Sequence, residues 1–146
     1  MNHELLIIFD NEQIFPEALT YTWEYAMRTD ARVHFLMLVA MSFSAIDLPG
    51  VKRNALRKIE ARAGNLLAQL TEIFIQKGIE TSSALRIGDP YQELLKFLAD
   101  RPLFQAIIWG SGEDIPCAGK KKGKHWICNI AANLECPLLT VSRRSK

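Results

Sequence analysis

The sequence lacks any segment that would place it in a membrane or export it. Residues 1–4 contain no basic stretch, and the apolar run 5–9 is far too short for a signal-peptide core or a membrane span. We therefore expect a cytoplasmic protein with no membrane partner.

Cysteine is also scarce. The three cysteines, Cys117, Cys128 and Cys136, are odd in number and form no Cys-x-x-Cys pair. This argues against a disulfide framework or a zinc site and favours free thiols in a reducing compartment. No Ser/His/Asp set, Cys/His set or carboxylate pair falls in one predicted site. The sequence therefore predicts a binding protein, not an enzyme, and no metal.

The excess of positive charge is small, at +2, and does not by itself predict a nucleic-acid partner. Its distribution is uneven, because four lysines fall in the stretch 119–124, here named the lysine loop. Two interpretations of this loop stay open, an anion-binding loop and a solvated loop. Nucleic acid is not expected, because the loop lacks interleaved aromatic residues and a large basic face.

What the chain does contain is a regular alternation of apolar runs and amphipathic segments. Its 146 residues, 49% of them hydrophobic, suffice for one domain with one continuous core. Buried strands are predicted at 5–9, 33–39, 106–109 and 138–141, and a more polar edge strand at 79–87. Helices are predicted at 16–29, 52–77, 90–101 and about 125–133. Residues 1–146 form a single predicted domain.

Strands that alternate with helices predict a parallel sheet joined by right-handed crossovers. The run 5–9 is continuously apolar, as expected of a central strand covered on both faces. We therefore predict a Rossmann-like α/β fold, a five-stranded parallel sheet of strand order 3-2-1-4-5 with helices on both faces. Such sheets bind ligands at the carboxyl ends of the strands, where the strand order reverses. That position brings together Asp10 and the sequence Gly110-Ser111-Gly112.

Each candidate side chain has a functional and a structural interpretation. Glycines after a buried strand let backbone N–H groups approach an anion. Asp10 is either a ligand contact or a turn residue before the first helix. His125 is either a donor to an anion or a solvated residue at the start of a helix. His34 lies in an apolar strand, which favours a hydrogen-bonded core histidine.

Five short motifs occur in order along the chain. They are Phe9-Asp10, Ala18-Leu19-Thr20-Tyr21, Gly88-Asp89-Pro90, Gly110-Ser111 and Cys136-Pro137. No single motif is diagnostic, but their order and spacing resemble the universal stress protein (UspA) family. The resemblance runs from about residue 4 to residue 142.

The nucleotide-binding members of that family share the pattern G-x2-G-x9-G-(S/T) after the fourth strand. Here Gly110 fits the first position, but Glu113 stands at the second, where its carboxylate opposes a polyphosphate. Counting forward places Gly123 on the third glycine and Lys124 on the hydroxyl residue. Counting back from the Cys-Pro motif places Lys124 on that glycine and His125 on the hydroxyl residue.

The resemblance implies an adenine nucleotide alpha hydrolase-like fold and a degenerate site for ATP or another adenine nucleotide. We expect that nucleotide to bind weakly or not at all. The contacts implied are Asp10, Val39, Gly110, Ser111, Gly112, Gly123, Lys124 and His125.

Two functions follow from the resemblance. The first is a non-catalytic stress-response or regulatory module that binds a nucleotide or another anion. The alternative is a protein that has lost nucleotide binding and acts through an unknown protein partner. In both cases the family implies a homodimer, and the short apolar last strand suits pairing at a sheet edge.

Overall fold

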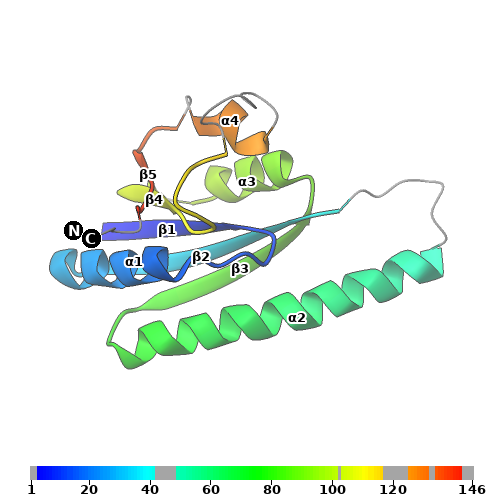
Figure 1. Ribbon diagram of the computed structural model, residues 1–146, viewed down its shortest axis with the longest axis horizontal. Coiled ribbons are helices and arrows are strands. Elements are labelled where there is room, and N and C mark those ends of the chain that lie inside the picture. Colours follow the sequence, from blue (N-terminus) through cyan, green and yellow to red (C-terminus); the bar gives the residue numbers. More distant parts are fainter. Residues whose placement is uncertain (1–2, 42–48, 102, 117–124, 132–133, 143–146) are drawn as a thin grey trace.

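The protein is built around one parallel β-sheet (Figure 1). The computed structural model describes residues 3–41, 49–101, 103–116, 125–131 and 134–142. The strand order is β3-β2-β1-β4-β5, and every neighbouring pair is parallel. This confirms the predicted sheet and the edge position of the third strand. The strands are β1 (His3–Asp10), β2 (Ala31–Ala40), β3 (Thr81–Gly88), β4 (Ala106–Trp109) and β5 (Leu138–Leu139).

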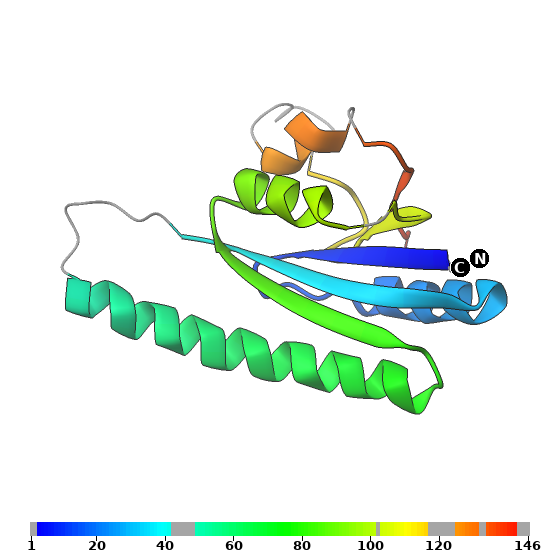
Figure 2. The ribbon, with the colours of Figure 1, turned by 180° about the vertical axis from the view of Figure 1, so that it is seen from behind.

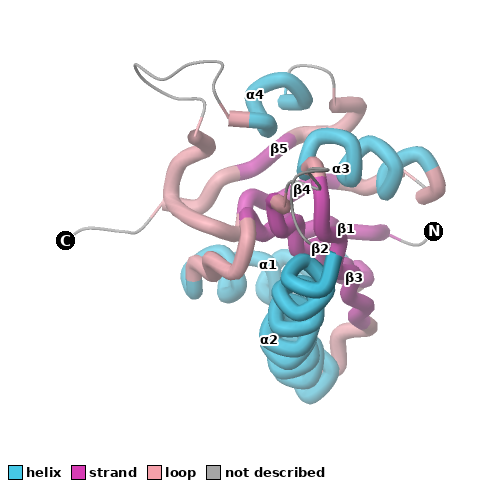
Figure 3. Tube along the Cα trace, turned by 90° about the vertical axis from the view of Figure 1, so that its right-hand side faces the viewer, coloured by secondary structure: helices cyan, strands magenta, loops and turns pink. Residues whose placement is uncertain are grey.

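Helices cover both faces of this sheet. In Figures 1 and 3, α1 (Pro16–Thr29) and α2 (Pro49–Gln76) lie on one face, and α3 (Pro90–Ala99) and α4 (Trp126–Ala131) lie on the other. The view from behind in Figure 2 shows that α2 extends past the carboxyl ends of the strands. The resulting three layers are the architecture that the alternating pattern predicts.

The central strand β1 contributes to two hydrophobic cores. Its residues Leu5, Ile7 and Phe9 belong to the core beneath α1 and α2, whereas Leu6 and Ile8 belong to the core beneath α3 and α4. All five side chains have an exposed fraction of 0%. Because side chains alternate between the faces of a strand, a strand covered on both faces is apolar at every position.

The start of α3 follows the predicted capping pattern. The Asp89 side chain accepts a hydrogen bond of 3.0 Å from the Tyr91 backbone N–H, and Pro90 occupies the first helical position. Proline costs little there, because the first helical N–H groups have no partner within the helix.

Several predicted boundaries differ from the observed ones. Helix α2 begins at Pro49 instead of residue 52, since proline is compatible with the first turn of a helix. Strand β5 comprises only Leu138–Leu139 of the predicted 138–141, because it pairs with two residues of β4 alone. Residues 132–133 of the predicted last helix and the lysine loop lie outside the described residues.

The expectation of free thiols is confirmed for one cysteine and wrong for another. Cys136 is free and half-buried; burial raises the pKa of its thiol, and the neighbouring Glu135 carboxylate raises that pKa further. Cys128 is disulfide-bonded. Cys117 lies outside the described residues. Among the helices of the described part, none is long and apolar enough to cross a membrane.

Candidate functional site

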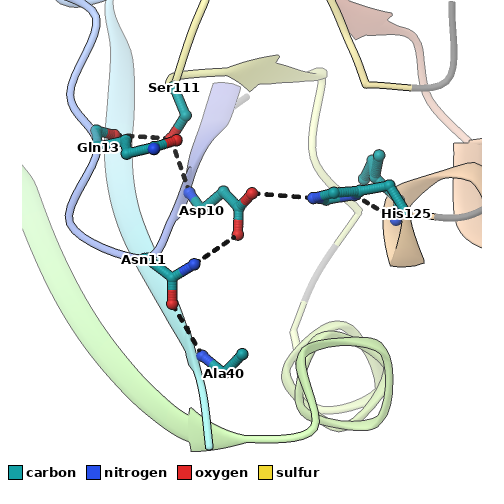
Figure 4. Close-up of polar contacts among 7 residues, drawn as sticks. Asp10, Asn11, Gln13, Ala40, Ser111 and His125 are labelled. Atoms are coloured by element: carbon teal, nitrogen blue, oxygen red, sulfur yellow. Dashed lines mark hydrogen bonds and ion pairs between the residues drawn. The ribbon is translucent and has the colours of Figure 1, made fainter. Parts of the chain in front are cut away.

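The carboxyl ends of β1 and β4 are joined by hydrogen bonds just beyond the sheet. Gly110 donates its backbone N–H to the Ile8 carbonyl at 2.8 Å. The next residue, Ser111, accepts a 2.7 Å hydrogen bond at Oγ from the Asp10 backbone N–H. Its hydroxyl then donates to the Gln13 carbonyl, also at 2.7 Å. Ser111 therefore fixes the position of Asp10 and of the turn that follows it (Figure 4).

Both carboxylate oxygens of Asp10 have partners. Oδ2 lies 2.8 Å from Nε2 of His125, and Oδ1 accepts a 3.3 Å hydrogen bond from the Asn11 amide (Figure 4). The two side chains of the Asp10–His125 pair are 17% and 22% exposed, respectively. The pair is thus near the surface but largely shielded from water. Charge-assisted hydrogen bonds are stronger in such a shielded position than in bulk solvent.

The orientation of the His125 ring is set by its other nitrogen. Nδ1 accepts a 3.1 Å hydrogen bond from the Ile127 backbone N–H, at the start of α4. A nitrogen that accepts cannot also carry a proton, so the hydrogen-bond network assigns the ring proton to Nε2, which points at Asp10. The imidazole also contacts two indole rings, Trp109 at 5.8 Å and Trp126 at 5.0 Å between centroids.

Asn11 connects this cluster to the end of β2. Its backbone is left-handed, with φ of 57°, a conformation that asparagine adopts more readily than most residues. The Asn11 backbone N–H donates to the Leu38 carbonyl at 2.8 Å, and Oδ1 accepts from the Ala40 N–H at 3.0 Å. The carboxyl ends of β1, β2 and β4 therefore share one hydrogen-bonded cluster with the start of α4.

The two glycines predicted to cradle a ligand have different surroundings. A Cβ at Gly110 would lie 2.7 Å from Phe9 Cε1 and 2.8 Å from Ile7 Cγ1, so Gly110 is required by packing between β4 and β1. A Cβ at Gly112 would meet nothing within 4 Å. Both glycines are predicted from the sequence to face a ligand. At Gly110, however, packing against Phe9 and Ile7 requires glycine whether or not a ligand binds.

The structure brings together only part of the predicted set. Asp10, Ser111 and His125 are linked by hydrogen bonds through the β1 turn, and Gly110 and Gly112 flank Ser111. Val39 is 6% exposed and packs in the core beneath α1 and α2, so little of its side chain is open to a ligand. Gly123 and Lys124 lie outside the described residues.

The Asp10-Asn11 pair directly after an apolar strand predicts a turn, and the left-handed Asn11 confirms it. The hydrogen bonds that Asn11 makes to the end of β2, and that Gln13 makes to Ser111, were not predicted. His34, in contrast, is hydrogen-bonded as predicted. Its two ring nitrogens lie 2.5 Å from Glu4 Oε1 and 2.6 Å from Ser82 Oγ, near the amino ends of the strands and away from this site.

Beside the site, the turn after β1 is tied to α2 by an ion pair. Arg62 donates from Nε to Glu12 Oε1 and from Nη2 to Oε2, both at 2.6 Å. The hydrogen bonds and positive charge of the guanidinium hold the pKa of the Glu12 carboxyl below its usual range. The turn that follows Asp10 is thus held from three sides, by β4, β2 and α2.

A separate apolar pocket of about 290 Å³ lies between α3 and α4. No residue of the predicted site lines it. Its walls include Leu95 and Leu98 of α3, Ile130 of α4 and Cys136. The described residues contain no group of three or more His, Cys, Asp or Glu side chains that would hold a metal ion.

Comparisons of the sequence with known proteins find no matching family model and no matching curated protein. Solved structures do match. The universal stress protein UspA from Lactobacillus plantarum has a TM-score of 0.70 and 16% sequence identity, with 97% of each chain covered. A universal stress protein family member from Burkholderia pseudomallei has a TM-score of 0.68 and 16% identity, with 96% of each chain covered. The chain has the universal stress protein fold.

One further protein of this fold was solved with a nucleotide. It is a universal stress protein family protein from Arabidopsis thaliana with AMP bound, at a TM-score of 0.50 and 17% identity, covering 97% of this chain and 93% of that chain. The universal stress protein fold predicted from the five motifs is therefore confirmed as a fold. At these identities it does not fix what the Asp10 site binds.

Proposed function

We propose that the protein is a cytoplasmic regulatory or stress-response protein that binds an adenine nucleotide without catalysis. The ligand would lie at the carboxyl ends of β1 and β4. The observation that carries this proposal is the convergence of Asp10, Ser111 and His125 at the point where the strand order reverses. Parallel α/β sheets bind ligands in that position. The AMP bound to the Arabidopsis thaliana protein supports the choice of ligand class.

The proposed binding is weak. Asp10 already accepts hydrogen bonds from His125 and Asn11, so a ligand that uses this carboxylate must first displace one of them. An intramolecular partner costs no loss of translational freedom, whereas a ligand must overcome that loss from its own contacts. Only the difference between the two sets of contacts contributes to affinity.

Titration calorimetry with AMP and with ATP, each with and without Mg²⁺, tests the proposal. We expect dissociation constants weaker than about 1 μM. Incubation with ATP should release no phosphate beyond the rate in buffer, because the described site has no nucleophile held by a free base. Absence of binding heat for both nucleotides would reject the nucleotide site, and steady phosphate release would reject the non-catalytic part.

The alternative function is a dimer that has lost its nucleotide and acts through a protein partner. The filled hydrogen bonds of Asp10 favour it. The sheet edge favours a homodimer under either function, because β5 has only two residues and both Leu138 and Leu139 are half-buried. Light scattering at micromolar concentration should give twice the chain mass. A single species of the chain mass would reject the dimer.

A further inference from the structure

The His125 imidazole lies in the position that a ligand donor would take on Asp10. Its Nε2–H points at Oδ2 at 2.8 Å, while Asn11 satisfies Oδ1. We propose that His125 is an internal competitor at this site and determines its specificity. Only ligands that present an N–H donor on a planar ring, in place of the imidazole, gain access to the Asp10 carboxylate. This inference rests on the proposed function, because it describes what the same site selects.

The position that the imidazole occupies is suited to a flat ring. Trp109 meets the imidazole edge-on, at 89° between ring planes, and Trp126 lies at 36° to it. Trp109 is 2% exposed and therefore fixed in the core. Aromatic rings favour such neighbours through dispersion and the quadrupole of the ring. A heteroaromatic base that replaced the imidazole would keep these contacts.

The Asp10 carboxylate also excludes one class of ligand. Both of its oxygens are acceptors, so inorganic phosphate, which presents mainly acceptors and negative charge, gains nothing there. Displacement of His125 breaks two hydrogen bonds. One is donated by Nε2–H to Asp10, and the other is donated by the Ile127 backbone N–H to Nδ1. A ligand therefore needs a donor that replaces the first of these bonds. The half-buried state of both side chains leaves a route for this exchange.

Chemical complementation tests the role of His125 without any nucleotide. In His125→Ala, added imidazole should bind at the vacated position and shift the backbone amide resonances of Asp10 and Asn11. The titrations are made about two pH units above the ordinary imidazole pKa of about 6.5, where both compounds are neutral. The matched ligand 1-methylimidazole then has no N–H donor and should leave these resonances unshifted. The double variant Asp10→Asn/His125→Ala should lose the response to imidazole. Equal responses to both compounds, or a wild-type response as large as that of His125→Ala, would overturn the inference.

Nucleotide affinity supplies the second part of the test. His125→Ala should bind AMP about tenfold more tightly than the wild type, since one charge-assisted hydrogen bond no longer has to be broken. Imidazole should then weaken AMP binding in the variant and leave the wild type unchanged. Equal AMP affinity in the two proteins would overturn competition while leaving the nucleotide site intact. No AMP binding in either would reject the proposed function, and the imidazole titration would still decide the role of His125.

A measurement on the wild type removes any dependence on how well His125→Ala folds. The ¹⁵N resonances of the His125 ring should show the Nε2–H tautomer in the absence of ligand. Saturating AMP should shift the Nε2 resonance, whereas inorganic phosphate should not. If AMP shifts the Asp10 amide resonance but leaves the His125 Nε2 resonance unchanged, AMP does not displace the imidazole, and the inference is wrong.

Discussion

Gly110 and Gly112 are separated by one residue and differ in what surrounds them. Gly110 adjoins the ring of Phe9 and the side chain of Ile7 in the core, whereas Gly112 faces open space. Sequence alone cannot separate these cases, because both glycines follow the same strand. The distinction depends on the direction in which a Cβ at each position would point after β4 ends.

Gly110→Ala should destabilise the fold, because its Cβ would lie 2.7 Å from a ring carbon of Phe9. Overpacking of this kind costs about 1–3 kcal/mol in the free energy of unfolding. Gly112→Ala is the matched control and should stay within about 0.5 kcal/mol of the wild type, because a Cβ there would meet nothing within 4 Å. Urea unfolding of the three proteins measures the difference. Equal stabilities for the two variants would show that Gly110 is not constrained by packing.

Sequence reasoning placed Asp10 beside Ser111 correctly, since that contact follows from strand order alone. It did not predict that His125 contacts Asp10. Of the two ways to count the family pattern, one places Lys124 and the other places His125 at the hydroxyl position near the phosphates. His125 is 115 residues away from Asp10 in the chain. Whether a side chain that far away reaches Asp10 depends on the path of the chain before α4. Residue patterns carry no information on that path.

At the scale of elements, the turn after β1 is the feature that connects the site to the rest of the fold. Glu12 in this turn pairs with Arg62 of α2, a helix of 28 residues that extends beyond the sheet. The existence of α2 and the cap of α3 were predictable from periodicity and capping residues. The Glu12–Arg62 pair was not, because exposed charges on a long helix offer many equivalent partners.

Glu12→Gln should lower stability in a manner that depends on pH. Arg62 depresses the pKa of the Glu12 carboxyl from the ordinary 4.5, so the folded state binds a proton less readily than the unfolded state. The stabilisation is therefore present above pH 4.5 and is lost as the pH falls through the lowered pKa. The difference in urea midpoint between variant and wild type should vanish on acidification.

Glu60→Gln is the control for this experiment. Glu60 lies on the same helix, is exposed, and has no ion pair among the described residues. Its replacement should leave the midpoint nearly unchanged at every pH, as is common for exposed charges. A pH-independent effect of Glu12→Gln would mean that the variant acts through packing and not through the charge of the pair.

At the scale of the molecule, the order of the sheet was predictable and the extent of its last strand was not. The apolar run of β1 marks a strand buried on both faces, and alternating helices make the sheet parallel. The edge strand β5 depends on pairing with only two residues of β4, which local sequence does not determine. The fold therefore follows from periodicity, whereas the site depends on contacts between distant segments.

We propose the cluster at the carboxyl ends of β1 and β4 as the ligand site, and titration of ¹⁵N-labelled wild-type protein with AMP, followed through backbone amide resonances, locates the bound ligand. The largest shifts should fall on Asp10, Asn11, Ser111 and the His125–Ile127 segment. Shifts centred instead on Leu95, Leu98 and Cys136 would move the site to the pocket between α3 and α4. That result, or no shifts at all, would show that AMP does not bind at the carboxyl ends of β1 and β4.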